Sequence, residues 1–491
     1  MTIAVICVGI CASTSVLFAA DAPPKSIEAT ARPPAKPDEP TVVKLTLHPA
    51  RPPAAALEYP LLPRFVDQTS GNAAMLYSKT IISLTDRKEP NDFWDKVDRW
   101  SEMPPAELPK NDVRNALAKY HEVFKLTKMA ARRARCDWEP PIHEQDDIFS
   151  ILLPEMQHLR SIGRLLALRA RVEIAEGQPA EAVETLQTGY ALARHTAECP
   201  FLVCGMVGAA ISGMMDNQLE TLVQSPNCPN LYWSITALPN PLIDLRPGLG
   251  LEADSLFLEF PELRDLEHAR HTPEEWESIL VRFGKRWRLI AAMGGDGGSS
   301  LEQFGMTAFM TGRAMALFPR AKSELVAAGH DRKTVDAMPA AQVILLHMVM
   351  TFGRSRDEMF KWFNLPYWQA RVGMADTDRK LNREIREQEL VPVASVLLPA
   401  LSSVRLASVR SERRIALLRV IEALRFYAAE HDGKLPEALD NIKEVPLPND
   451  PVSGKPFGYK LGDGKATLDA PPPAGETWLS LGTRCEITIA K

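Results

Sequence analysis

Gly454 and Lys455 stand side by side in the stretch "LPNDPVSGKPFGYKLGDGKATL", residues 447–468, and nucleotide-binding loops use this pair of residue types. A phosphate loop of the Walker type needs G-x-x-x-x-G-K-[ST], so that backbone amides cradle a phosphate and a helix starts at the lysine. Here Pro456 follows the lysine, and the first glycine of the motif is absent. The pattern therefore argues against a nucleotide site.

The same stretch has the residues of a turn and a hairpin. Asp450 and Pro451 fit the first corners of a tight turn, because proline fixes φ at the second corner. Two short strands, 457–461 and 465–468, flank Gly462-Asp463-Gly464, which suits the positive φ of a hairpin turn. We interpret the stretch as a turn followed by a hairpin, with the lysine in solvent.

Histidine and cysteine, both metal-binding residue types, occur together at His195, Cys199 and Cys204. Zinc sites usually carry a Cys-x2-4-Cys pair and a matching second pair, and this chain has neither. The cysteines after the N-terminal segment are odd in number and irregularly spaced, although an oxidising compartment could pair four of them: Cys136, Cys199, Cys204, Cys228 and Cys485. We predict buried thiols and no metal site.

A second histidine pair, in "EHARHTPEEWE", is also better explained without a metal. His268 and His271 miss the i, i+4 spacing that places two imidazoles on one helical face. Thr272-Pro273 followed by Glu274 and Glu275 predicts a helix start, with the threonine as its cap.

Possible binding residues lie in "PNLYWSITALPNPLIDLRPGL", residues 229–249. Tyr232, Trp233, Asp244 and Arg246 carry polar groups that could face a groove, and they are the candidate binding residues. The alternative is an aromatic core with a buried Asp-Arg pair. Both interpretations stay open from the sequence.

An enzyme would have to assemble its site from scattered residues. The chain has no Gly-x-Ser-x-Gly elbow and no His-Glu-x-x-His. The candidates for a hydrolase or carbohydrate-active enzyme are Glu139, Asp244, Arg246 and Glu252. No residue is assigned a catalytic role, and no cofactor is predicted.

The N-terminal region predicts export. Residues 1–20 contain an apolar run that ends in small residues, the pattern of a signal peptide, although an uncleaved membrane anchor is the alternative. Residues 21–63 are rich in proline and predict an extended, disordered tether. Cys7 and Cys11 lack the preceding pattern of a lipoprotein.

Helical periodicity dominates the next region, residues 64–395. In residues 162–194 the apolar residues recur at helical spacing on both sides of "EGQPAEA", where Gly177 fits the end of one helix and Pro179 the start of the next. This segment resembles one tetratricopeptide hairpin. Residues 201–215 are apolar but too short for a typical membrane span, and predict a core helix.

The last region, 396–491, predicts a small α+β unit. Leu417, Ile421 and Leu424 belong to one apolar helical stripe, with Glu422 and Arg425 on the opposite side. Asp432-Gly433 ends this helix, "KLPEAL" predicts a short second helix, and "RCEITIAK" alternates as a final strand. The fold class is thus mainly α: a body of helical hairpins and a tail in which a helix covers an antiparallel sheet.

Several stretches together carry a resemblance. "HDGKLPEAL" and "PNDPVSGKPFGYKL" resemble the C-terminal globular part of type II secretion pseudopilins. With "LLALRARVEIAEG", "MPAAQVILL" and "FKWFNLPYWQA", they are more similar still to a family of exported, uncharacterised proteins of planctomycete-type bacteria. The resemblance spans most of residues 64–491 and implies export, but no established activity.

Composition narrows the function. A net charge of −5 and a pI of about 6.1 give no reason to expect nucleic-acid binding. We expect an exported scaffold in the periplasm or cell envelope that binds a protein or peptide, with membrane contact only if the N-terminal segment stays uncleaved. The alternative is the hydrolase or carbohydrate-active enzyme above.

Overall fold

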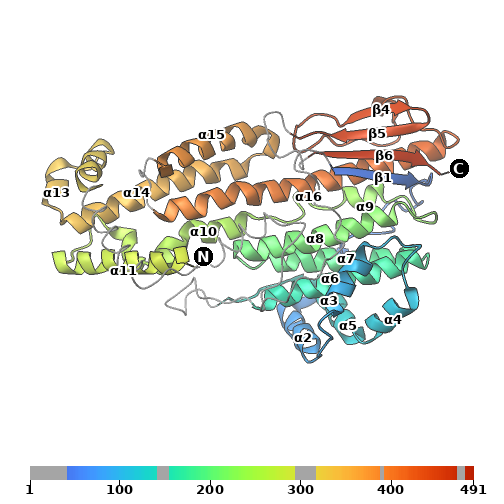
Figure 1. Cartoon of the computed structure of the whole chain (residues 1–491), viewed down its shortest axis with the longest axis horizontal. Helices are drawn as coiled ribbons and strands as arrows, with labels where there is room; N and C mark the ends of the chain where they lie inside the picture. The colour runs from blue at the N-terminus through green and yellow to red at the C-terminus, as the bar shows by residue number, and fades with distance from the viewer. Residues whose placement is uncertain (1–40, 141–153, 293–316, 387–391, 473–481, 491) are drawn as a thin grey trace. The chain divides into compact units, whose positions relative to one another are not determined.

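The protein is mainly helical and has a small sheet, as the sequence predicts (Figure 1). The computed structural model describes residues 41–140, 154–292, 317–386, 392–472 and 482–490. The predicted signal peptide and the first part of the predicted tether lie outside these residues. Among the described residues, one compact unit comprises 41–140, 154–248 and 406–490, and the other comprises 249–405.

This division differs from the predicted boundary at residue 396. The helices before residue 248 and the tail belong to one unit, whereas 249–405 forms the other. The tail is therefore not a separate module, because its core is completed by helices that precede it by hundreds of residues. A linker-like composition is absent at both points of division, which fall within helices α10 (Arg246–Glu259) and α16 (Pro392–Glu430).

Three packed helices form the centre of the first unit: α6 (Pro154–Ala175), α7 (Pro179–Ala197) and α8 (Leu202–Leu222). Gly177 has φ 72° and ends α6, while Pro179 starts α7, so the predicted hairpin is confirmed. The apolar stretch at 201–215 forms most of α8, whose side chains are largely buried. Gly208 permits close packing, because a Cβ there would lie 2.6 Å from the Ala193 carbonyl oxygen.

Shorter helices cover these three. They are α2 (Ala74–Thr85), α3 (Phe93–Glu102), α4 (Lys110–Ala118) and α5 (His121–Ala131). Helices α3 and α4 contact α6, and α5 contacts both α2 and α7. Before α2, a 3-10 turn (Phe65–Asp67) precedes strand β2 (Thr69–Asn72), which pairs in parallel with β3 (Arg133–Arg135) and ties the start of α2 to the end of α5.

The four-stranded sheet joins the two ends of the described chain. Its order is β1-β6-β5-β4, formed by β1 (Thr41–Leu47), β6 (Thr483–Ile489), β5 (Lys465–Ala470) and β4 (Gly458–Gly462). The hairpin β4–β5 and the final strand are as predicted, and both pairings are antiparallel. The predicted antiparallel sheet of the tail is thus confirmed for β4, β5 and β6, whereas β1, which precedes the tail by hundreds of residues, pairs with β6 in parallel and makes the whole sheet mixed.

Strand β1 also corrects the predicted tether of residues 21–63. The sequence "TVVKLTL" alternates, and Leu45 and Leu47 are buried in the sheet. Beyond it, the Gln187 side chain donates a hydrogen bond to the Pro60 carbonyl, and Leu61 is buried. Residues 41–63 are therefore part of the folded unit. The many prolines of this segment predicted a tether. The short alternating pattern of β1 gave no sign of its partner β6, which lies at the other end of the chain.

Helix α16 ends as predicted but is covered on more sides than predicted. Its apolar residues Leu417, Ile421 and Leu424 are buried, and Gly433 donates to the Ala428 carbonyl at 2.8 Å in the predicted stop. Glu422 and Arg425, on the opposite side, are also fully buried. The predicted helix at "KLPEAL" is wrong: only a 3-10 turn, Leu439–Asn441, forms there, because Pro436 instead accepts a hydrogen bond from the Tyr459 hydroxyl.

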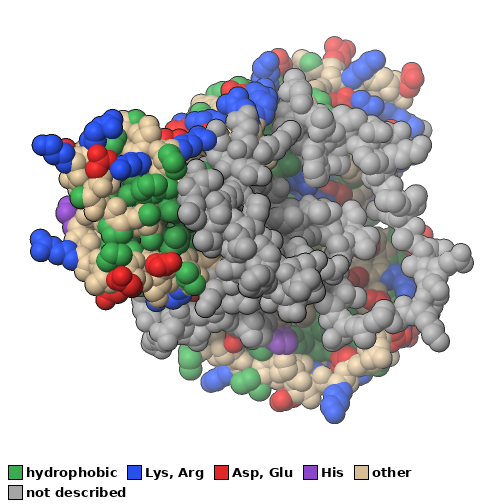
Figure 2. Space-filling model, turned by 60° about the vertical axis from the view of Figure 1, so that its left-hand side comes forward, with side chains coloured by type: hydrophobic (Ala, Val, Ile, Leu, Met, Phe, Trp, Pro, Cys, Tyr) green, Lys and Arg blue, Asp and Glu red, His purple; other side chains and the backbone are tan. Residues whose placement is uncertain are grey.

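The second unit is helical throughout its described part. After the end of α10 come a 3-10 turn (Pro261–Asp265), α11 (Pro273–Ala292), a helical stretch at 317–327, α13 (Arg332–Ala337), α14 (Ala340–Phe360), a 3-10 turn (Lys361–Asn364), α15 (Tyr367–Arg386) and the start of α16. Helix α14 contacts α11 and α15. In Figure 2, hydrophobic side chains gather toward the left of the view.

Candidate functional site

A groove of about 600 Å³ lies on the first unit, between α4, α5, α6 and the start of α7. We call it the α4–α6 groove. Its apolar lining comprises Leu117, Ala118, Phe124, Met129 and Val172. Its charged lining comprises Arg114, Lys125, Lys128, Arg132, Arg169, Glu173 and Glu176, with His121 and Gln178. Cationic side chains therefore outnumber carboxylates around an apolar floor.

Helical spacing places these side chains together. Phe124, Lys125 and Lys128 lie within two turns of α5, and Arg169 and Glu173 are one turn apart on α6. Phe124 is largely buried, whereas Met129 is 44% exposed at the groove surface. A Met side chain adapts its shape readily to a partner.

Among the described residues, the cations at the rim take part in solvent-exposed ion pairs. Lys128 Nζ lies 2.5 Å from Glu184 Oε1, Arg132 Nη2 lies 3.5 Å from the same oxygen, and Lys125 contacts Glu122 at 3.6 Å. Two cations thus share the single carboxylate of Glu184. Exposed pairs of this kind contribute roughly 0–1 kcal/mol each, so an incoming anion can replace them at little cost.

A buried carboxylate lies at the base of the groove. Glu173 is 7% exposed, and its Oε1 accepts a hydrogen bond from Arg169 Nε at 2.8 Å. Burial raises the pKa of Glu173, and the Thr185 hydroxyl and the Arg169 guanidinium oppose part of that rise. Oε2 has no hydrogen-bond partner of good geometry among the described residues. Arg169 and Thr185 therefore both act on this buried carboxylate.

A second carboxylate, Glu176, lies one turn further along the same groove. Arg114 Nη1 lies 3.3 Å from its Oε1. Arg169 is also positioned by Phe124, since its guanidinium carbon lies 5.0 Å from the ring centroid. Both carboxylates of the groove therefore have an arginine neighbour.

The predicted binding residues form two separate local pairs. Tyr232 is completely buried, its ring packs edge to face on half-buried Trp233, and its hydroxyl donates to the Pro446 carbonyl. Tyr232 is thus a core residue, as in the alternative interpretation. Among the described residues, no hydrogen bond, ion pair or ring contact joins this pair to Asp244 or Arg246.

Asp244 and Arg246 pair with each other at the surface. Arg246 Nη2 lies 2.7 Å from Asp244 Oδ2, with side-chain exposures of 61% and 40%, and Arg246 N donates to Asp244 Oδ1 at 3.0 Å. The guanidinium lowers the pKa of Asp244. Asp244 and Arg246 are therefore not a buried pair, and their contact is local to the start of α10.

Of the enzyme candidates, Glu139 is exposed in a loop with φ 46°, and its amide donates to Asp137 Oδ1 at 3.1 Å. Glu252 belongs to α10 in the second unit, where desolvation raises its pKa to about 7.

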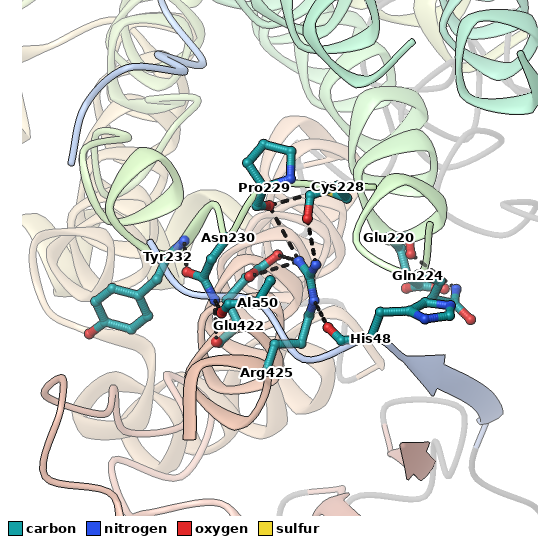
Figure 3. Close-up of polar contacts among 10 residues, drawn as sticks. All are labelled: His48, Ala50, Glu220, Gln224, Cys228, Pro229, Asn230, Tyr232, Glu422 and Arg425. Carbon is teal, nitrogen blue, oxygen red and sulfur yellow. Dashed lines mark hydrogen bonds and ion pairs between the residues drawn. The ribbon is translucent and has the colours of Figure 1, made fainter. Parts of the chain in front are cut away.

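The region next to Tyr232 is held in place by a network of hydrogen bonds around Arg425 (Figure 3). Arg425 donates from Nη1 to both oxygens of Glu422 at 2.8 and 3.0 Å, from Nη2 to the Cys228 carbonyl at 2.7 Å, and from Nε to the His48 carbonyl at 2.9 Å. Asn230 donates to the Ala50 and Glu422 carbonyls at 3.2 and 2.8 Å. This network, which we call the Arg425 cluster, joins α16 to the segment after β1 and to the loop before α9 (Tyr232–Thr236).

The histidine and cysteine side chains near α8 are also engaged in contacts within the protein. His195 Nδ1 lies 3.0 Å from the Tyr77 hydroxyl, and burial lowers the pKa of His195 to about 4, so the ring is neutral at pH 7. All cysteines in the described ranges, including Cys199 and Cys204, are buried free thiols, as predicted. No group of three His, Cys, Asp or Glu residues in those ranges is arranged to hold a metal.

The helix start predicted beside the second histidine pair is confirmed. Thr272 N donates to Glu275 Oε2 at 2.7 Å, and Glu275 N donates to Thr272 Oγ1 at 3.3 Å, which is a reciprocal capping box at the start of α11. His268 pairs with Asp265 at 2.8 Å, and His271 packs edge to face on Trp276.

The sequence interpretation missed the α4–α6 groove. A signal was present, because residues 119–135 carry many Lys and Arg and a single acidic residue, Glu122. The net charge of the whole chain is −5, so the overall charge does not reveal this local excess of Lys and Arg.

Neither a family model, a curated protein nor a solved structure matches the chain. Within the described ranges, every helix is too short or too polar to cross a membrane.

Proposed function

We propose that the protein is an exported helical scaffold that holds an extended segment of a partner protein of the cell envelope in the α4–α6 groove. The observation that carries the proposal is the open groove itself, which combines an apolar lining, exposed at Met129, with a charged rim on a packed helical array. An open surface of this kind suits a chain laid across helices better than an enclosed small molecule. The apolar N-terminal segment and the proline-rich residues after it support export.

A photo-crosslinking experiment tests the groove. A photoreactive amino acid replaces Met129, which is in the groove and 44% exposed, or Met75 on α2, which is 66% exposed and does not line the groove. We expect crosslinks from the Met129 position to one recurring segment of one envelope protein, and the synthetic segment should bind the purified protein. Equal crosslinking from both positions, or failure of the synthetic segment to bind, would contradict the proposal.

Cell fractionation tests export. The mature protein should be found in the envelope or periplasmic fraction, and mass spectrometry should show a terminus beyond the apolar segment or an intact, membrane-associated one. An intact Met1 terminus on a soluble cytoplasmic protein would show that export is wrong.

One observation favours the alternative of a hydrolase or carbohydrate-active enzyme. Glu173 and Glu176 line the same groove, and burial raises the pKa of Glu173 while Arg114 accompanies Glu176. Two carboxylates in different environments suit acid and base roles. We prefer the scaffold because Arg169 already engages Glu173. Hydrolysis of a glycan panel by the wild type that is lost in both Glu173→Gln and Glu176→Gln would favour the enzyme instead.

A further inference from the structure

The charges of the α4–α6 groove point to the chemistry of its ligand. We infer that the groove binds an acidic peptide segment, whose carboxylates contact Lys125, Lys128 and Arg132. This inference rests on the proposed scaffold function and names the ligand class of the same groove.

The rim selects anions because its positive charge is incompletely matched. Lys128 and Arg132 share Glu184, and both have side chains that are about 40% exposed, at 41% and 42%. A ligand carboxylate can therefore reach both cations without displacing a buried contact. Favourable charge across an interface raises the association rate and excludes partners of the wrong sign.

The apolar lining of the groove fits the apolar side chains of such a segment. An extended chain also alternates its side chains, so apolar residues can face the Phe124 and Met129 floor while acidic ones face the rim.

The test measures charge selection. The probes are short peptides with blocked ends in which leucine alternates with glutamate, glutamine or lysine, and binding is measured by fluorescence anisotropy. We expect the glutamate peptide to bind at least about tenfold more tightly than the others, and more weakly as salt rises. Lys125→Glu/Lys128→Glu should remove this preference, while Lys460→Glu on exposed β4 should keep it.

Several outcomes would overturn the charge inference. The glutamine peptide binding as tightly as the glutamate peptide would leave the scaffold proposal intact but refute acidic selection. Equal competition by inorganic phosphate or by an oligonucleotide would show a general anion site. Photo-crosslinking to a basic segment would refute it as well. Circular dichroism checks that each variant is folded.

Discussion

The Arg425 cluster and the α4–α6 groove use charge in opposite ways within the same unit. Arg425 and Glu422 are both 0% exposed, and every guanidinium nitrogen has a protein partner. In the groove, Lys128 and Glu184 are 41% and 45% exposed, and the buried Glu173 retains an acceptor without a good hydrogen bond. A saturated cluster fixes the fold and leaves nothing for a ligand. An unsaturated one on an open surface is where binding is expected.

The largest expected effect comes from breaking the Arg425 cluster. Glu422→Ala leaves a buried guanidinium without its counter-charge, which should cost about 3–5 kcal/mol. Urea unfolding followed by amide protection in α16 measures the loss. The control is Glu430→Gln, whose partner Arg51 is 68% exposed, and the expected loss there is below about 1 kcal/mol.

A double replacement sharpens that result. Glu422→Leu with Arg425→Met removes both charges, and it should recover much of the stability lost in Glu422→Ala, because a desolvated pair costs nearly as much as it returns. If Glu422→Ala is no worse than Glu430→Gln, the pair is not buried as described and the comparison fails.

A second buried carboxylate, Asp216, predicts that the stability of the protein depends on pH. Desolvation raises the pKa of Asp216 from 3.8 to about 6, although Arg414 opposes the rise and the Tyr190 hydroxyl donates to Asp216 Oδ1 at 2.8 Å. The folded state then holds a proton more tightly than the unfolded state. Stability from this group is greatest below pH 3.8 and falls as the pH rises to about 6.

Asp216→Asn should therefore stabilise the protein at pH 7 by about 1–3 kcal/mol and flatten its stability between pH 4 and 6. The neutral amide still accepts from Tyr190. Urea unfolding at several pH values makes the comparison, with Asp463→Asn in the exposed hairpin turn as the control. A destabilised Asp216→Asn at pH 7 would mean that the charged carboxylate is needed for packing near Glu220 and Arg414.

These contrasts show where sequence reasoning succeeds. The turn at Gly177, the Thr272 capping box and the β4–β5 hairpin were predicted because each depends on residues within one or two turns of chain. The burial of Arg425 was not, because its partners are His48 and Cys228, far away in sequence. The same holds for β1, which completes a sheet with β6.

The candidate site was harder to predict than the fold. Tyr232 and Trp233 attracted attention as aromatic residues, yet aromatic residues serve cores more often than grooves. The groove depends on how α4 and α5 pack beside α6, and its helical residues alternate between buried and exposed positions as in any amphipathic helix. Only the local excess of Lys and Arg in residues 119–135 marked it.

A smaller effect is expected at the groove rim. Lys128→Ala removes one exposed ion pair and should change the free energy of unfolding by no more than about 1 kcal/mol. Its effect on binding of the glutamate peptide should be larger than its effect on stability. A thermal melt and the anisotropy assay on the same sample compare the two. A large loss of stability with unchanged peptide binding would show that Lys128 supports the fold and does not bind the peptide.

The smallest expected effect is at Lys455, the residue that first suggested a phosphate site. Asp450 closes the turn, since Gly454 N donates to its carbonyl at 2.7 Å and Val452 N donates to its Oδ1 at 3.0 Å. Its carboxylate also accepts from Arg413 Nη2 at 2.7 Å, with both side chains almost completely buried. The turn is thus held by Asp450, while the Lys455 side chain is exposed.

Lys455→Ala should leave stability within about 0.5 kcal/mol of the wild type. Asp450→Ala should cost several times more, because it leaves the buried Arg413 without its counter-charge. Isothermal titration with ATP should give no binding to the wild type. If the wild type binds nucleotide and Lys455→Ala does not, then the protein binds an anion at Lys455 and not at the rim of the groove.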